Sequence, residues 1–307
     1  MKSWKLLVLI ALLTGVSGCV DVVPVSTPDA AAADQPGVSA ESKRLRKYYS
    51  GVQSRLLAQG LLRTDGGGPD APFDASTLAR DFERIALFDE YTVAGGRFVA
   101  QQTPSTLRRW QKPVRIAITF GDLVPPETRE KDRANVVAFA RRLARLTGVD
   151  IRITDKNPNF HVLFLNRDEQ KAAGPDLRKM IPGLSPVVVR EIAESPRNTF
   201  CVAYAFSNQG AVGTYDSAII LIKSEHTDLM RLSCIHEEMA QAMGLANDSP
   251  QARPSIFNDD EEFALLTRHD ELLLRMLYDK RLRPGMAVNS AKALLPTIAQ
   301  DVLKGSS

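Results

Sequence analysis

The stretch from Cys234 to Asp248, C-I-H-E-E-M-A-Q-A-M-G-L-A-N-D, decides the fold and carries the densest chemistry of the chain. His236 and Glu237 open it in the way that a helical metal site of the pattern H-E-x-x-H would open. The fifth position of that pattern is Ala240, which has no ligand atom. In this frame the stretch therefore lacks its second metal ligand.

Shifting the frame by one residue gives a closer fit, to the longer pattern H-E-x-x-H-x-x-G-x-x-H. The stretch resembles this signature of the metzincin metalloproteases in its spacing. Glu238 then stands at the general-base position and Gly244 at the turn glycine. The positions of the three imidazole ligands hold oxygen-bearing side chains, which are Glu237, Gln241 and Asn247.

A helical period supports the shifted frame, because it separates the stretch into an apolar and a polar side. Glu237, Glu238 and Gln241 gather on the polar side. His236 falls at the edge of the apolar side, where a lone histidine is predicted to be a packing residue. The apolar side, which we expect to be buried, consists of Leu232, Ile235, Met239, Ala242 and Met243.

The metzincin resemblance continues downstream of the motif. The segment Ser255-Ile256-Phe257-Asn258 stands where that family carries its Met-turn, with Phe257 in place of methionine. The run Leu266 to Asp279 resembles the closing helix of matrix-type members. The resemblance implies an α+β, zincin-like fold: a mixed sheet, an active-site helix and a C-terminal helix, here with an N-terminal helical appendage.

A second resemblance is closer, to the proteobacterial lipoproteins grouped as domain of unknown function 2927. Three strings carry it: E-E-M-A-Q-A-M-G-L-A-N-D, then S-I-F-N-D-D, then L-Y-D-K-R-L-R-P-G-M from Leu277 to Met286. This family brings no established activity.

The N-terminus predicts export. Lys2 and Lys5 precede an apolar run from Leu6 to Leu13, which is too short to span a bilayer and is typical of a secretory signal peptide. Its end, V-S-G-C, resembles a lipobox and implies lipidation of Cys19 after cleavage. The following Val20 implies a lipid-anchored protein at the periplasmic face of the outer membrane, with the inner membrane as the alternative.

The net charge and the cysteine count limit which binding partners and which covalent links the sequence predicts. Formal net charge is +3 with both signs nearly balanced, which does not favour a nucleic-acid partner. Besides Cys19 the chain contains only Cys201 and Cys234. Because an exported protein meets an oxidising compartment, we expect these two cysteines to form a disulfide. Such a bond would join the motif helix to a β-like run. Two buried free thiols are the alternative.

The chain divides by composition into five parts. We expect helices over Glu41–Leu62 and over Thr77–Phe88, the latter capped by Ser76, and a hairpin of Thr199–Phe206 with Ala218–Ile222. The parts are a signal peptide (1–18), a flexible tether (19–41), an N-terminal helical region (42–105), a zincin-like domain (106–290) and a C-terminal tail (291–307).

The chemistry of the motif does not suit zinc, which needs imidazole or thiolate ligands. Glu237, Gln241 and Asn247 offer only oxygen, which suits Ca²⁺, Mg²⁺ or Mn²⁺ better. We therefore expect no metal or cofactor, with a divalent cation as the alternative. The predicted binding residues are Glu237, Gln241, Asn247, Asp248, Asn258 and Asp259.

Three functional hypotheses follow. In the first, a degenerate zincin-like domain of a cell-envelope lipoprotein binds a protein, peptide or peptidoglycan partner. In the second, an atypical metal-dependent hydrolase uses Glu238 as its general base. In the third, zinc is bound by His236 and a distant histidine, best His269, and otherwise His161 or His226. A purely structural role in the envelope is the remaining alternative.

Overall fold

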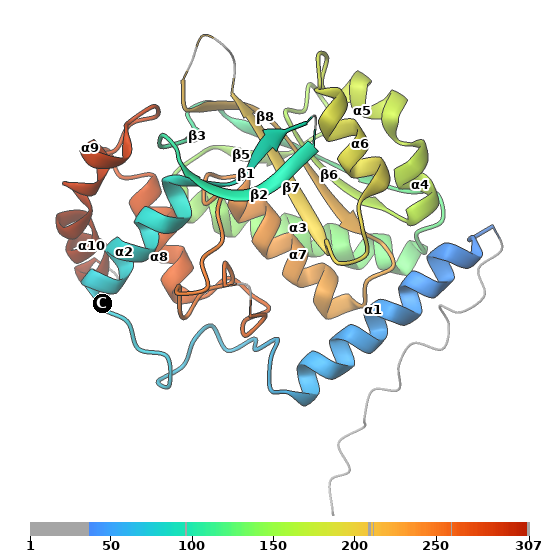
Figure 1. The fold of residues 1–307 in the computed structure, drawn as a ribbon, viewed down its shortest axis with the longest axis horizontal. Helices are drawn as coiled ribbons and strands as arrows, with labels where there is room; N and C mark the ends of the chain where they lie inside the picture. The colour runs from blue at the N-terminus through green and yellow to red at the C-terminus, as the bar shows by residue number, and fades with distance from the viewer. Residues whose placement is uncertain (1–36, 96, 208–209, 211, 259, 306–307) are drawn as a thin grey trace, which may run out of the picture. The chain divides into compact units, whose positions relative to one another are not determined.

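A mixed, mostly parallel sheet with helices on both faces forms the centre of the fold (Figure 1). The computed structural model describes residues 37–95, 97–207, 210, 212–258 and 260–305, which belong to one compact unit. The predicted signal peptide, Cys19 and the tether up to residue 36 lie outside the described residues. No described helix is long and apolar enough to cross a membrane.

The sheet is built around two parallel strands, β6 and β8, that are apolar at most positions, as is typical of strands covered on both faces. The strand order is β3-β8-β6-β4-β5, and β7 pairs antiparallel with β8, as the predicted hairpin requires. The strands are β3 (Arg109–Trp110), β4 (Val114–Phe120), β5 (Ile151–Ile153), β6 (Phe160–Leu165), β7 (Cys201–Ser207) and β8 (Thr214–Lys223).

Alternate residues of the strands divide between two hydrophobic clusters, one on each face. Val162 and Phe164 of β6 pack in the main cluster with α3 and α7, whereas Leu163 and Leu165 pack with α5 and α6, and α4 contacts β6. The last three helices are six to nine residues long, too short to give a clear helical period, and the sequence did not predict them. These five helices are α3 (Pro126–Thr147), α4 (Arg167–Ala172), α5 (Gly174–Met180), α6 (Pro186–Glu194) and α7 (Asp228–Gln241).

The remaining elements come from the two ends of the described chain. α2 is capped at its N-terminus by Asp74, whose side chain accepts a hydrogen bond from the Thr77 amide. The predicted cap, Ser76, lies inside the first turn and donates to Asp74, because the carboxylate is the stronger acceptor. α10 packs against α2 and α8, within the segment predicted as a tail. These elements are α1 (Ala40–Ala58), α2 (Ala75–Ala86), β1 (Phe88–Ala94), β2 (Arg97–Pro104), α8 (Arg268–Leu277), α9 (Val288–Lys292) and α10 (Leu295–Lys304).

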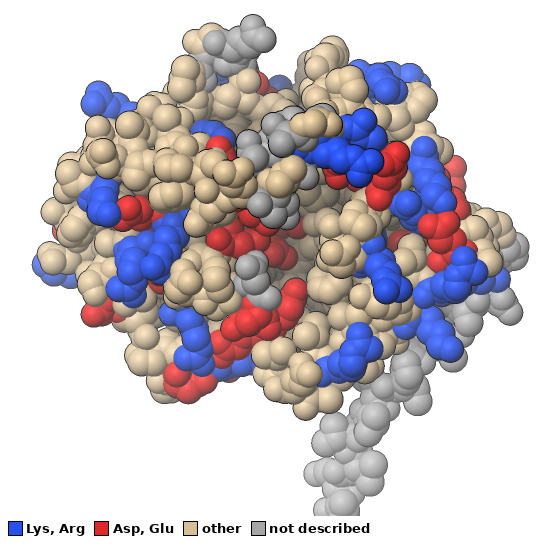
Figure 2. Space-filling view, in the orientation of Figure 1, with Lys and Arg blue, Asp and Glu red and all other residues tan. Residues whose placement is uncertain are grey.

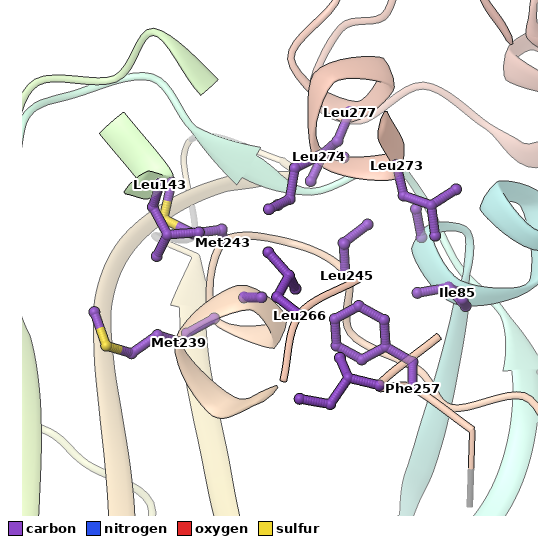
Figure 3. Packing of buried hydrophobic residues seen from close by; sticks show 14 of the residues in the cluster. Ile85, Leu143, Met239, Met243, Leu245, Phe257, Leu266, Leu273, Leu274 and Leu277 are labelled. Carbon is purple, nitrogen blue, oxygen red and sulfur yellow. The ribbon is translucent and has the colours of Figure 1, made fainter. Parts of the chain in front are cut away.

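The buried side of α7 anchors the main cluster (Figure 3). Met239 and Met243 lie among leucines from α3 and α8, and both are at most 1% exposed. Phe257, which stands where the metzincin resemblance expects a methionine, is fully buried in the same cluster. The other labelled side chains of this cluster are Ile85, Leu143, Leu245, Leu266, Leu273, Leu274 and Leu277.

A glycine is required where the chain turns after α7. Gly244 has φ +122°, and a Cβ there would lie 2.2 Å from the Arg108 carbonyl oxygen. Two hydrogen bonds hold this turn from neighbouring elements: Trp110 Nε1 donates to the Ala242 carbonyl, and the Tyr278 hydroxyl donates to the Met243 carbonyl. The glycine of the motif is thus explained by backbone contact with β3.

Gly244→Ala is expected to lower the free energy of unfolding by roughly 3 kcal/mol or more, because it adds backbone strain and a clash with a carbonyl that cannot move. Gly60→Ala is the matched control, since Gly60 also has a positive φ but no atom near a Cβ. We expect that control to cost about 1 kcal/mol. Urea unfolding of both variants measures the difference, and equal losses would contradict the close approach.

Candidate functional site

The polar side of α7 forms part of the wall of a cavity. Glu237, Glu238 and Gln241 all line it, whereas Ile235 and Met239 are fully buried in the core on the opposite side. The helical period of the sequence therefore predicted the three polar residues and the buried Ile235 and Met239 correctly. Leu232, predicted on the buried side, is only half-buried, and the buried Ala242 also lines the cavity.

The cavity has a volume of about 900 Å³ and is bounded by several elements. β7 and α7 form two walls, and the start of β1, one side of α6 and the stretch before β7 contribute to others. Described residues between 246 and 263 complete the lining. Figure 2 shows Asp and Glu side chains gathered around a hollow near the middle of this face. The volume falls within the usual range for small-molecule sites, roughly 300–1,000 Å³.

The lining is strongly acidic. Among the described residues that line the cavity, Arg108 is the one basic side chain, and it pairs with Asp89 and interacts with Tyr215. Its positive charge is therefore largely neutralised by these two neighbours. The lining carboxylate residues are Asp89, Glu90, Glu191, Glu237, Glu238, Asp248 and Glu261.

Glu237, which is half-buried, and Glu238, which is buried, form an adjacent acid pair. One carboxylate oxygen of each lies within 4.8 Å of the other. Burial, followed by the nearby carboxylates, including Asp248 and Glu90, raises the pKa of both residues well above the usual 4.5. The pair thus favours holding a proton over carrying two charges.

Glu238 is the more enclosed member of the pair. Its side chain is 4% exposed, and its Oε2 has no hydrogen-bond partner within the described part of the chain. A buried acceptor left without a donor is energetically unfavourable. This oxygen is therefore the strongest indication that the cavity binds a ligand.

The other motif positions are divided between the cavity and the core. Gln241 Nε2 donates to Asp248 Oδ1 at 3.1 Å, and both residues line the cavity. Asn247 is buried elsewhere: its Nδ2 donates to the Arg84 carbonyl and its backbone amide to the Ile85 carbonyl, joining the turn to α2. The structure therefore brings Asp248, and not Asn247, together with the acid pair.

Asn258, the next predicted binding residue, lines the cavity at its rim. Its Nδ2 donates to the Ala252 carbonyl at 2.9 Å, which fixes the loop. Asp259 lies outside the described residues.

The histidines do not assemble at the cavity. The His236 ring stacks on Phe139 with centroids 4.1 Å apart, its Nδ1 accepts from the Leu266 amide, and burial lowers its pKa to about 3. His269 is fully buried, with Nε2 3.2 Å from Asp81 Oδ2. The donor set on the cavity wall therefore does not fit zinc. The cavity-lining residues of the described chain also do not include His161 or His226.

The predicted disulfide is confirmed. Cys201 of β7 and Cys234 of α7 are joined, with Cα atoms 5.8 Å apart. Cys201 Sγ lies 4.0 Å from Glu237 Oε2, but a disulfide sulfur has no proton to donate and is not a thiolate ligand. The bond therefore positions the acid pair against β7 without neutralising it.

Several site residues were missed by the sequence reasoning. Glu90, Glu191 and Glu261 come from β1, α6 and a loop, far from the motif in sequence. Tyr204 lies on β7, and burial, Glu191 and Glu238 raise its pKa. No local pattern marks these residues, because only the tertiary fold gathers them.

Comparison with known proteins identifies the family. The chain matches the family described as "Protein of unknown function (DUF2927)" over residues 75–297. It belongs to the DUF2927 family. The matched part includes every residue that lines the cavity, so the acidic cavity lies wholly inside the DUF2927 region. No curated protein and no solved structure matches the chain.

Glu238→Gln is expected to change how stability depends on pH. The raised pKa means that the folded state binds more protons than the unfolded state, so stability falls as pH rises from about 4.5 towards the raised pKa. Glu238→Gln removes one of the two ionisations and should flatten this loss. The free energies of unfolding of the wild type and the variant should therefore diverge as pH rises from 5 to 8. The variant should lose less stability over this range.

Urea unfolding at a series of pH values measures this slope. Glu130→Gln, at an exposed position of α3, is the control and should follow the wild type. Parallel curves for Glu238→Gln and the wild type would contradict the acid pair.

Proposed function

We propose that this DUF2927 chain is a binding protein of the cell envelope, which takes an extended peptide segment into the acidic cavity and is not a zinc protease. The segment could belong to a partner protein, a free peptide or the stem peptide of peptidoglycan, which share the same backbone chemistry. The observation that carries the proposal is the orientation of β7 at the cavity.

β7 presents its backbone edge to the cavity. Its residues 202–206 all line the cavity consecutively. Both of its faces are partly packed, Ala203 and Ala205 against the main cluster and Val202, Tyr204 and Phe206 against the second cluster. We therefore infer that β7 lines the cavity at successive positions through its backbone edge.

That edge suits an added strand. In the described part of the chain, β7 pairs as a strand only with β8, so it is an edge strand of the sheet. An exposed sheet edge binds extended peptides by main-chain hydrogen bonds, while adjacent cavities select side chains. The acidic floor formed by Glu237 and Glu238 supplies such a selective feature below the edge.

The proposed location follows from the N-terminus. We infer a lipid anchor at Cys19 in the outer membrane, with the segment up to about residue 41 as a tether. The zincin-like character of the α7 motif is likewise part of this proposal: spacing and turn glycine support it, with the imidazole ligands replaced.

A second candidate is a cation-dependent hydrolase in which Glu238 acts as the general base. The closeness of the Glu237 and Glu238 carboxylates favours it, because a hard cation is bound by such oxygens. Metal analysis of chelator-free protein, with casein and muropeptide assays of the wild type and Glu238→Gln, separates the candidates. Stoichiometric metal together with Glu238-dependent cleavage would replace the binding hypothesis.

The peptide-binding hypothesis is tested by amide hydrogen exchange of the full chain in mild detergent, with and without muropeptides or a casein peptide digest. A bound strand should slow exchange of the amides of β7 at least several-fold, because it adds hydrogen bonds to that edge. β5, the strand at the opposite edge of the sheet, is the internal control and should not change. Binding with no protection of β7 would contradict the proposed mode.

A further inference from the structure

We propose that the Glu237–Glu238 pair recognises an ammonium group, so that the peptide carries a lysine-type side chain or a free N-terminus over the floor of the cavity. This inference rests on the proposed function, because it assigns the ligand chemistry of the same cavity. Three features of the cavity support it: an unmet acceptor, a missing countercharge and a matching set of donors and acceptors.

The unmet acceptor is Glu238 Oε2. The side chain is more than nine-tenths buried, it lines the cavity, and this oxygen has no hydrogen-bond partner among the described residues. Its neighbour on the helix, Glu237, also lines the cavity and contacts a disulfide sulfur that cannot donate a proton. This oxygen has almost no accessible surface, so a hydrogen-bond donor from the ligand would satisfy it once the carboxylate turns towards the cavity.

The missing countercharge points to a cationic ligand. Carboxylates face the pair from several elements: Glu90 from β1, Asp248 and Glu261 from the segment after α7. Glu191 on α6 also lines the cavity, and Arg108 is paired with Asp89. The described lining thus offers the pair no positive charge of its own, and a cation would relieve the repulsion among these groups.

The donors of an ammonium group match the acceptors at the floor. An ammonium has three donors on one compact centre. Glu237 and Glu238 supply carboxylate oxygens, and Gln241, whose Nε2 donates to Asp248, has its Oε1 as a third acceptor. The apolar side chains Ile256 and Phe263 line the same cavity and suit the methylene stem of a lysine-type side chain.

A divalent cation fits this floor less well. Ca²⁺ takes six to eight oxygen ligands and Mg²⁺ requires near-octahedral geometry. Within the described residues, the group of ligand atoms that lie within 4.8 Å of one another comes from Glu237, Glu238 and Cys201, and the cysteine is in the disulfide. Two carboxylates hold an ammonium with fewer additional ligands than such a metal needs.

Binding of the ammonium is expected to release a proton. The empty pair holds a proton because burial and neighbouring carboxylates disfavour two charges, and the incoming cation favours the doubly ionised form. Affinity should therefore rise with pH until the pair is ionised in the free protein or the amine loses its own proton. No bond to carbon forms or breaks in this step.

The test is calorimetric titration of the full chain in mild detergent with three probes. These are the terminally blocked tripeptide Ala-Lys-Ala, the same peptide with acetylated lysine, and 1,5-diaminopentane. We expect the lysine peptide to bind at least tenfold more tightly than its acetylated form and to release protons, seen as a heat that depends on the buffer. Glu237→Gln and Glu238→Gln should each remove most of that preference, whereas Glu130→Gln should keep it.

The outcomes separate this inference from the proposed function. Equal binding of both peptides with protection of β7 would overturn ammonium recognition and leave peptide binding intact. Binding of 1,5-diaminopentane alone would support ammonium recognition and overturn the peptide mode. Failure of all three probes to bind a folded protein, or binding of Ca²⁺ or Mg²⁺ to the pair in place of the amine, would overturn the inference. Circular dichroism verifies that each variant is folded.

Discussion

The rest of the structure depends on the position of α7 between the core and the acidic cavity. Its apolar side is packed among α3 and α8, and its polar side must then face the cavity, so Glu238 cannot move out to solvent without unpacking Met239. The disulfide from Cys234 to β7 holds the middle of the helix, and the hydrogen bonds from Trp110 and Tyr278 hold its C-terminal end. The partial burial of two adjacent carboxylates is a consequence of core packing.

This constraint gives the cavity its chemical character. Holding two adjacent carboxylates in place with no cationic partner in the described lining lowers the stability of the protein. A ligand that binds the pair would explain why the protein has this arrangement. The antiparallel edge strand β7 lines the same cavity as the pair. One wall therefore offers main-chain groups and the floor offers charge, a combination that suits a peptide with a basic group better than a zinc-bound water.

The sequence predicted those features that depend on local pattern or on compartment. The helical period predicted the polar side of α7, and the predicted export signal made pairing of Cys201 with Cys234 the expected state. The structure confirms the disulfide. The prediction was wrong for the cap of α2, because Asp74 outcompetes Ser76 as an acceptor. It also omitted α4 to α6, whose lengths are too short for a period to emerge.

The sequence by itself determined the family, the turn glycine and which side of the motif helix is polar, because each is encoded in residues close together along the chain. Only the tertiary structure decided which oxygens meet in the cavity. Asn247, placed by spacing at a ligand position, is held by the carbonyls of α2, and Asp248 faces the cavity instead. Glu90, Glu191 and Glu261 join the site from separate elements. Spacing fixes direction only within a helix, and the chain beyond Gln241 is no longer helical, so its side chains are aimed by the packing they meet.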